Sequence, residues 1–232
     1  MKKILILFLT ILSIFLIYRI FKTDKINYIS IGDSLINGTN SYNINGYGYN
    51  SYIKNYLERN KKLNTFNNYF YNNSITGLTF DIQNNRTLLI DDKEYFLKKI
   101  LRESDVLVIS IGMDELSYNY RSDMNYNYKY FDKMYLDIEK LVKEVKKYTV
   151  NKIVFIGYYN PTKLYTSDID EYFYYINEKL TNLMKKNNII YIDIYEEIKA
   201  GNYQDNPNNH HLNTNGYLKI ANLLLKYLEK SW

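Results

Sequence analysis

A serine and two adjacent histidines are the residues whose types could do chemistry together in this chain. Ser34 follows Gly32-Asp33 at the end of an apolar run, and His210 and His211 are the only two histidines of the 232 residues. A serine hydroxyl is a weak nucleophile until a base removes its proton, and histidine is the usual base. The base would therefore have to be His210 or His211, and the pattern favours nucleophilic catalysis at Ser34.

The composition excludes several other kinds of site. The absence of cysteine excludes disulfide scaffolds, zinc–thiolate sites, iron–sulfur clusters and a cysteine nucleophile. A hydrolytic metal centre needs several ligands at one place, and Asp114, Glu115, Asp205 and the two histidines are the candidates. No glycine-rich phosphate loop follows an apolar run. We therefore expect no metal and no cofactor.

Short apolar runs alternate with amphipathic stretches from residue 26 to the end of the chain, without repeats or a linker. This alternation predicts a single domain, 26–232, with a three-layer α/β/α architecture and a mostly parallel sheet of about five strands. In such sheets the functional site lies beyond the carboxyl ends of the strands. The expected strands are 26–31, 65–71, 106–111, 152–156 and 189–194, and the expected helices are 47–59, 94–102, 130–148, 169–186 and 214–228.

The first 25 residues predict an export signal or a membrane anchor. Lys2 and Lys3 precede a run from Ile4 to Tyr18 that only two hydroxyl residues interrupt. No small-residue cleavage site follows, and residues 4–21 reach the short end of a bilayer span. We expect an uncleaved signal anchor, with residues 26–232 on the extracytoplasmic side, or a secreted protein if the segment is cleaved.

The positive charge does not suggest a nucleic-acid partner. The formal net charge is +5, but most of that excess belongs to residues 1–25, so the predicted domain is nearly neutral. Binding of nucleic acid would need a basic surface on the domain itself. The sequence does not indicate an oligomeric state.

Four short blocks, in their order along the chain, resemble the SGNH/GDSL hydrolase family of serine esterases. The first block is Gly-Asp-Ser-Leu at 32–35 with Gly38, and Gly77 matches the glycine of the second. Gly-Met-Asp-Glu at 112–115 matches the third, Gly-x-Asn-Asp block. His-Leu-Asn-Thr-Asn-Gly-Tyr at 211–217 matches the last block, which selects His211 over His210. The resemblance covers essentially all of residues 26–232.

The resemblance implies a flavodoxin-like sheet and an ester substrate. Ser34 would be the nucleophile, His211 would be the general base and later acid, and the backbone N–H groups of Ser34 and Gly77 would stabilise the oxyanion. The ester would be an O-acetyl group on an envelope glycan, or a lipid ester, hydrolysed through an acyl-enzyme. Two alternatives remain: an O-acyltransferase that uses the same site, and a binding module with an impaired site.

The chain departs from the family at two site positions. Asp114 stands where the family has an asparagine that donates to the oxyanion, and an ionised carboxylate donates nothing. Loss of one such donor typically costs ~10²–10³ in rate. Asp114 would serve if it were protonated; otherwise the register is different, or Asn119 takes its place. Asn208 stands where the family has the aspartate that orients the histidine. Its amide oxygen can orient the imidazole of His211 but stabilises the imidazolium less than a carboxylate does, and Asp205 is an alternative acid.

A tyrosine-rich stretch, residues 117–130, follows the third predicted strand. Its position predicts that it overhangs the site, where its rings could stack on sugars or line an acyl groove. We expect substrate specificity to reside there.

Overall fold

The computed structural model describes residues 25–90, 92–123, 127–149, 151–162, 166–206 and 209–229. In chain order its elements are β1 (Ile26–Gly32), α2 (Tyr49–Arg59), β2 (Leu63–Phe70), α3 (Ile75–Gln83), β3 (Thr87–Ile90), β4 (Lys93–Phe96), α4 (Leu97–Glu103), β5 (Val106–Ser110), α5 (Met113–Asp123), α6 (Tyr128–Val145), β6 (Lys152–Ile156), α7 (Ser167–Lys186), β7 (Ile190–Ile192), α8 (Tyr195–Lys199) and α9 (Thr214–Glu229).

A five-stranded parallel sheet forms the centre of the protein. Its strand order is β2-β1-β5-β6-β7, and each described pairing within it is parallel. This is the strand order of flavodoxin-like sheets. The second strand is added on one side of the first, and all later strands are added on its other side. The predicted three-layer architecture and the five-stranded sheet are therefore confirmed.

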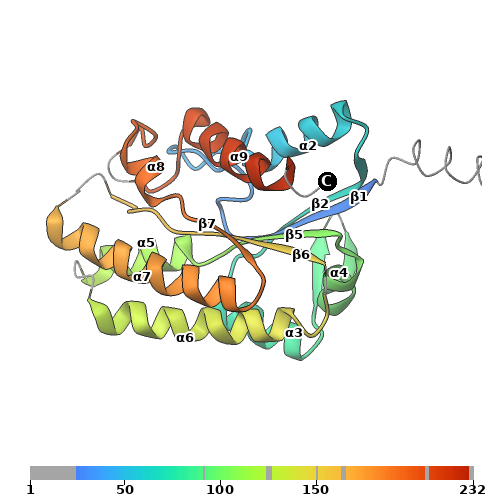
Figure 1. The fold of residues 1–232 in the computed structure, drawn as a ribbon, viewed down its shortest axis with the longest axis horizontal. Helices are drawn as coiled ribbons and strands as arrows, with labels where there is room; N and C mark the ends of the chain where they lie inside the picture. The colour runs from blue at the N-terminus through green and yellow to red at the C-terminus, as the bar shows by residue number, and fades with distance from the viewer. Residues whose placement is uncertain are drawn as a thin grey trace, which may run out of the picture.

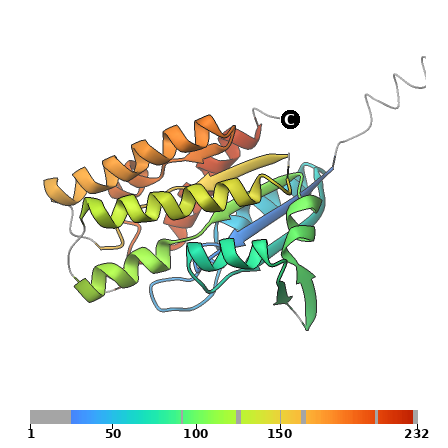
Figure 2. The ribbon, with the colours of Figure 1, turned by 90° about the horizontal axis from the view of Figure 1, so that it is seen from below.

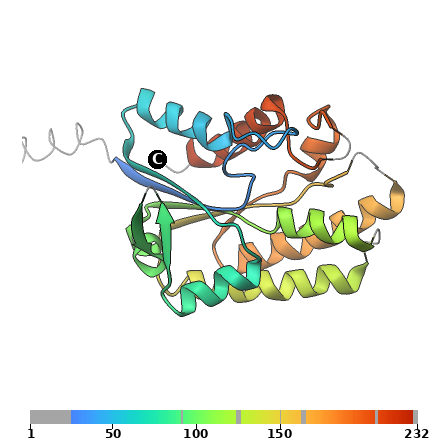
Figure 3. The same cartoon turned by 180° about the vertical axis from the view of Figure 1, so that it is seen from behind.

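Helices cover both faces of the sheet (Figure 1). Helices α2, α8 and α9 lie on one face, and α3, α6 and α7 lie on the other. Seen from the second side, α6 and α7 run next to each other across the sheet (Figure 2). A small antiparallel hairpin, β3–β4, extends from the end of the molecule at which β1 begins (Figure 3).

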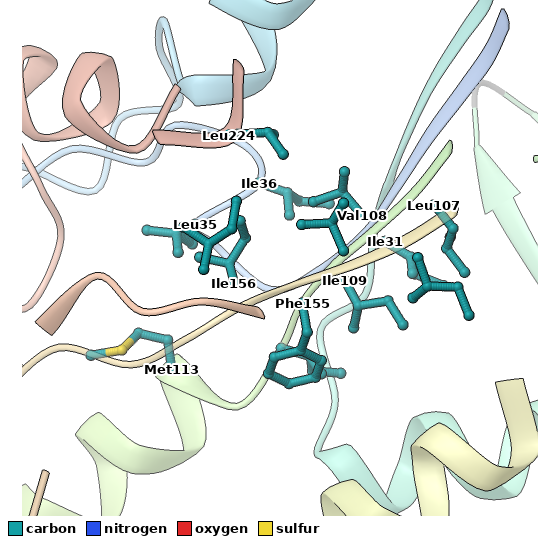
Figure 4. Packing of buried hydrophobic residues seen from close by; sticks show 14 of the residues in the cluster. Ile31, Leu35, Ile36, Leu107, Val108, Ile109, Met113, Phe155, Ile156 and Leu224 are labelled. Atoms are coloured by element: carbon teal, nitrogen blue, oxygen red, sulfur yellow. The ribbon is translucent and has the colours of Figure 1, made fainter. Parts of the chain in front are cut away.

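Apolar periodicity explains why these segments form strands and helices. All five residues of β5 are buried, as expected for a central parallel strand with both faces covered. Helix α6 buries one stripe that includes Phe131, Ile138 and Leu141, and its first turn is capped by the Asn127 side chain. Figure 4 shows side chains from β1, β5 and β6 meeting between the layers, with Leu224 of α9 approaching from above.

The sequence prediction was wrong at the β3–β4 hairpin, outside the central sheet. Residues 94–96, expected at the start of a helix, form strand β4, and α4 begins at Leu97. Helices α3, α5 and α8 were not predicted. They are short, and they fall in ranges for which the sequence predicts neither a strand nor a helix.

The predicted membrane segment, residues 4–21, lies outside the described residues. Within the part of the chain that the structure describes, no helix is long and apolar enough to cross a bilayer.

Candidate active site

The end of β1 carries Asp33 and Ser34 to the carboxyl edge of the sheet. Gly32 allows β1 and β5 to approach closely there, because a Cβ atom at this position would lie 1.7 Å from the carbonyl oxygen of Ser110. The next residue, Asp33, donates its N–H to that same oxygen at 2.9 Å. Any larger side chain in place of Gly32 would therefore push the nucleophile turn away from β5.

Asp33 links the turn that carries Ser34 to the turn that follows β5. Its buried carboxylate accepts the backbone N–H groups of Leu35 (3.3 Å), Met113 (2.8 Å) and Asp114 (3.3 Å). Gly112, at φ 100°, provides the backbone conformation that this second turn needs. Burial, followed by repulsion from Asp114, raises the pKa of Asp33 to about 7.

Ser34 and His211 are in direct contact, as the sequence predicted for a nucleophile and its base. The Oγ atom of Ser34 lies 2.9 Å from Nε2 of His211, and both side chains are buried. His211 is held in the segment before α9, where its N–H donates to Asn209 Oδ1 (2.9 Å) and its carbonyl accepts from Ser41 Oγ (2.9 Å). This geometry allows His211 to remove the hydroxyl proton of Ser34.

Asp114 also contacts the nucleophile. Ser34 donates its backbone N–H to Asp114 Oδ2 (3.3 Å) and its hydroxyl proton to Oδ1 (2.5 Å). Burial alone would raise the pKa of Asp114, but hydrogen bonds from His210 and Ser34 outweigh burial and lower that pKa. Asp114 therefore occupies the place that the third block predicts for it, so the alternative register is unnecessary. The side chain of Asn119 lies outside the described ones.

His210 completes a second contact chain that the sequence did not reveal. Its Nε2 atom lies 2.9 Å from Asp114 Oδ1, and its Nδ1 atom lies 2.9 Å from Ser117 Oγ. The rings of His210 and His211 are 4.1 Å apart between centroids. The available signal was that the departure at the third block is an acid, Asp114, in a chain whose only two histidines are adjacent.

The other predicted site residues are placed less directly. Gly77 donates its N–H to Ser74 Oγ (3.0 Å) as part of the cap of α3, and its role as an oxyanion donor stays a prediction. Asp205 accepts from Asn213 Nδ2 at 2.8 Å and is exposed, an arrangement that does not use it to orient His211. Asn208 lies outside the described residues, and its predicted role is not tested.

A polar cavity of about 390 Å³ adjoins the two histidines. Its remaining described walls come from residues 41–43 and from the side chains of Asn206 and Asn209. Sequence analysis missed these lining residues as candidates for substrate contact, among them Tyr42, which is 71% exposed at the cavity.

The tyrosine-rich stretch reaches the site at its first residue, Ser117, which contacts His210, whereas its described end from Asn127 packs on other helices. Tyr128, for example, packs edge-on against Tyr172 and Tyr175 of α7.

Among the side chains that the structure describes, one group has ligand atoms close enough together to hold a metal ion. Ligand atoms of Asp114, His210 and His211 lie within 4.8 Å of one another. Two of these side chains, Asp114 and His210, already bond to each other, and His211 bonds to Ser34. The group is thus satisfied by direct hydrogen bonds, and the expectation of no metal stays a prediction.

The sequence is similar to one family of known proteins. The sequence profile described as GDSL-like Lipase/Acylhydrolase matches residues 28–224. No curated protein matches the sequence significantly.

Similar solved structures share the fold at low identity. They include a lipase from a goat rumen metagenome, with a TM-score of 0.67 and 16% identity over 87% of this chain and 97% of that one. An acetylxylan esterase from Geobacillus stearothermophilus has a TM-score of 0.60 and 15% identity over 88% of this chain and 95% of that one. An α/β hydrolase from the metagenome of Lake Arreo, Spain, has a TM-score of 0.60 and 14% identity, covering 87% and 94%.

Proposed function

We propose that this chain, which belongs to the GDSL-like lipase/acylhydrolase family and is an ester hydrolase of that type, cleaves short acyl esters of a glycan through an acyl-enzyme at Ser34. The observation that carries the proposal is the 2.9 Å contact between Ser34 Oγ and His211 Nε2. A hydroxyl with its base in place is the arrangement that acyl transfer needs.

In the first half of the reaction, the Ser34 hydroxyl rotates its proton from Asp114 Oδ1 towards His211 Nε2, and His211 takes that proton as Oγ attacks the ester carbonyl carbon. The electron pair of the carbonyl π bond moves onto the carbonyl oxygen, which becomes the oxyanion of a tetrahedral intermediate. The backbone N–H of Ser34 then donates to this oxygen in place of Asp114. When the intermediate collapses, the bond to the alcohol breaks and His211 gives its proton to the departing alkoxide. The acyl group then remains on Ser34 as an ester.

In the second half, water replaces the alcohol. His211 takes a proton from the water, and the resulting hydroxide adds to the acyl carbon. Collapse of this second intermediate breaks the bond to Ser34 Oγ, which recovers its proton from His211. The products are the free alcohol and a carboxylic acid, and the enzyme returns to its starting state.

A glycan ester fits the cavity better than a lipid ester. Besides the two histidines, the cavity is lined by Ser41, Tyr42 and three asparagines. Amide and hydroxyl groups suit the hydroxyls of a sugar, and an exposed tyrosine ring suits its apolar face. The acetylxylan esterase among the similar structures acts on an acetylated glycan by its name, which supports the same choice.

The test is hydrolysis by the full-length chain of p-nitrophenyl esters of increasing acyl length, together with release of acetate from acetylated xylan. We expect the acetate ester to be cleaved faster than the octanoate, and Ser34→Ala to remove both activities. Thr39→Ser is a matched control, because it changes a buried hydroxyl residue near Ser34 by a single methyl group. Full activity of the Ser34→Ala protein would overturn the mechanism, and preference for octanoate would overturn the glycan substrate.

For location, we propose that residues 1–25 anchor the enzyme in a membrane with the hydrolase domain on the extracytoplasmic side. The support is the charged and apolar sequence of that segment. Protease added to intact cells should degrade an epitope tag placed at the C-terminus. Protection of the tag until the cells are lysed would contradict this location.

A further inference from the structure

A chain of four side chains runs through the site. From Ser34 Oγ it passes to Asp114 Oδ1 (2.5 Å), on to His210 Nε2 (2.9 Å), and from His210 Nδ1 to Ser117 Oγ (2.9 Å). Only the serine at its start belongs to the Ser34–His211 pair. The three other side chains have no step in the mechanism above, yet one of them touches the nucleophile.

Asp114 alone would oppose the reaction. Its Oδ2 atom accepts the backbone N–H of Ser34 (3.3 Å), the same donor that must stabilise the oxyanion. A carboxylate at this distance repels the negative charge that develops there, and the side chain is only partly exposed to screening water (36%). An active enzyme therefore needs something that offsets the charge of Asp114.

His210 is placed to provide that offset. It is the basic side chain that pairs with Asp114 among the described residues. Each ring nitrogen of His210 lies near an oxygen that can accept a hydrogen bond from an N–H group. Nε2 lies near Asp114 Oδ1, and Nδ1 lies near Ser117 Oγ. Its backbone is held as well, because the hydroxyl of Tyr159 donates to its carbonyl oxygen at 2.7 Å.

We propose that His210 is a positioning residue that holds and neutralises Asp114, so that the Asp114–His210 pair takes the place of a neutral amide side chain beside the oxyanion. This inference rests on the proposed function, since it assigns His210 a part in that reaction. It gives the neighbouring histidines separate tasks: His211 transfers protons, and His210 acts on the reaction through Asp114.

The charges of the transition state agree with this assignment. When His211 has taken the proton of Ser34, one positive ring faces one developing oxyanion. Asp114 adds a negative charge to this pair, and a protonated His210 cancels it. Without His210 the site would carry an uncompensated negative charge next to the oxyanion, in surroundings where charges are poorly screened.

A double-mutant cycle tests whether His210 works through Asp114. The full-length wild type is compared with His210→Ala, Asp114→Asn and the double variant, using kcat and KM for p-nitrophenyl acetate. In the wild-type background we expect His210→Ala to lower kcat ~10²–10³-fold with KM nearly unchanged, the usual cost of a lost oxyanion interaction. In the Asp114→Asn background the same change should cost less than about threefold, because a neutral amide needs no counter-charge.

Each outcome decides the proposal. Equal losses in the two backgrounds, or wild-type kcat in His210→Ala, would overturn it. His210→Gln supplies a matched control that keeps a neutral donor near Asp114; activity at the wild-type level in this variant would show that charge is not involved, and would also overturn it. Circular dichroism and thermal melting of every variant separate a loss of fold from a loss of chemistry.

A second readout does not depend on turnover. In ¹H–¹⁵N spectra of the histidine side chains, Asp114→Asn should shift the ring nitrogens of the histidine whose signals disappear in His210→Ala. If the folded wild type cleaves no ester, the proposed function fails, and these spectra still decide whether His210 is bound to Asp114. Unchanged His210 signals in Asp114→Asn would overturn the pairing itself.

Discussion

Two histidines that are neighbours in the sequence have different partners in the site. His211 contacts the nucleophile directly, whereas His210 contacts Asp114, and their rings are only 4.1 Å apart. One loop before α9 thus brings both imidazoles to the end of β1. The comparison shows that residue type and loop position do not determine the role of a histidine, because the atoms that face its two nitrogens do.

Substitution of His211 should lower kcat much more than substitution of His210 does. His211→Ala and Ser34→Ala each remove a participant in proton transfer and bond formation, and we expect each to lower kcat ~10⁴–10⁶-fold, as in other serine hydrolases. The loss in His210→Ala should be at least tenfold smaller. Steady-state kinetics on p-nitrophenyl acetate measure both, and equal losses for the two histidines would contradict the division of roles.

The buried carboxyl group of Asp33 should make the free energy of unfolding depend on pH. The folded-state pKa of Asp33 is about 7, above its ordinary value of 3.8. The folded protein therefore holds this proton more tightly than the unfolded chain does. Its contribution to stability is fully present below pH 4 and is lost as the pH rises to about 7.

Melting curves from pH 4 to pH 8 measure this contribution. We expect the wild-type Tm to fall by at least about 3 °C more than the Tm of Asp33→Asn, which has no carboxyl group to titrate. Parallel pH profiles for the two proteins would show that Asp33 does not titrate in this range.

Ser117 should affect the reaction only by way of His210. Ser117→Ala removes one hydrogen bond from Nδ1 of that ring, and a net bond strength of about 0.5–1.5 kcal/mol corresponds to a fall in kcat of about twofold to thirteenfold. The same change in a His210→Ala background should have no further effect. A full threefold loss in that background would place the influence of Ser117 elsewhere.

Asp205 should matter least among the predicted acids. It accepts a hydrogen bond from Asn213 on the surface, so Asp205→Asn should change kcat by less than about twofold. A loss of 10²-fold or more would show that Asp205 reaches His211 in the working enzyme. Ser167→Ala, another change at an exposed polar residue, is the matched control for substitution itself.

Removal of metal ions should not affect the activity that depends on the two histidines. Asp114, His210 and His211 lie close enough to bind an ion, but the proposed chemistry uses them for proton transfer and hydrogen bonding without a metal ion. Dialysis against EDTA should leave kcat unchanged. Loss of activity that zinc then restores would replace this mechanism with a metal-assisted one.

The sequence was sufficient to predict elements whose burial follows a simple period. The central strands β1, β5 and β6 and the long helices α6, α7 and α9 have strong apolar patterns, and the structure contains each within a few residues of the expected range. The β3–β4 hairpin has no comparable signal. It is short and lies outside the main sheet, so long-range burial does not enforce its pattern.

Within the site, the sequence could predict chemistry but not every contact. Ser34 and His211 follow from their types and from motif spacing, and the structure brings them together. The pairing of Asp114 with His210 joins residues that are 96 positions apart, and no spacing rule connects them. Such a contact depends on how the turn after β5 and the loop before α9 pack together, which is a property of the whole fold.

The central claim, that Ser34 is a nucleophile activated by His211, is tested most directly by labelling with a fluorophosphonate. The full-length wild type, His211→Ala and His210→Ala are treated with the probe, and mass spectrometry identifies the modified residue. We predict modification at Ser34 in the wild type, none in His211→Ala, and slower modification in His210→Ala. Absence of label from the folded wild type, or label on Ser34 that persists at the wild-type rate in His211→Ala, would contradict the account.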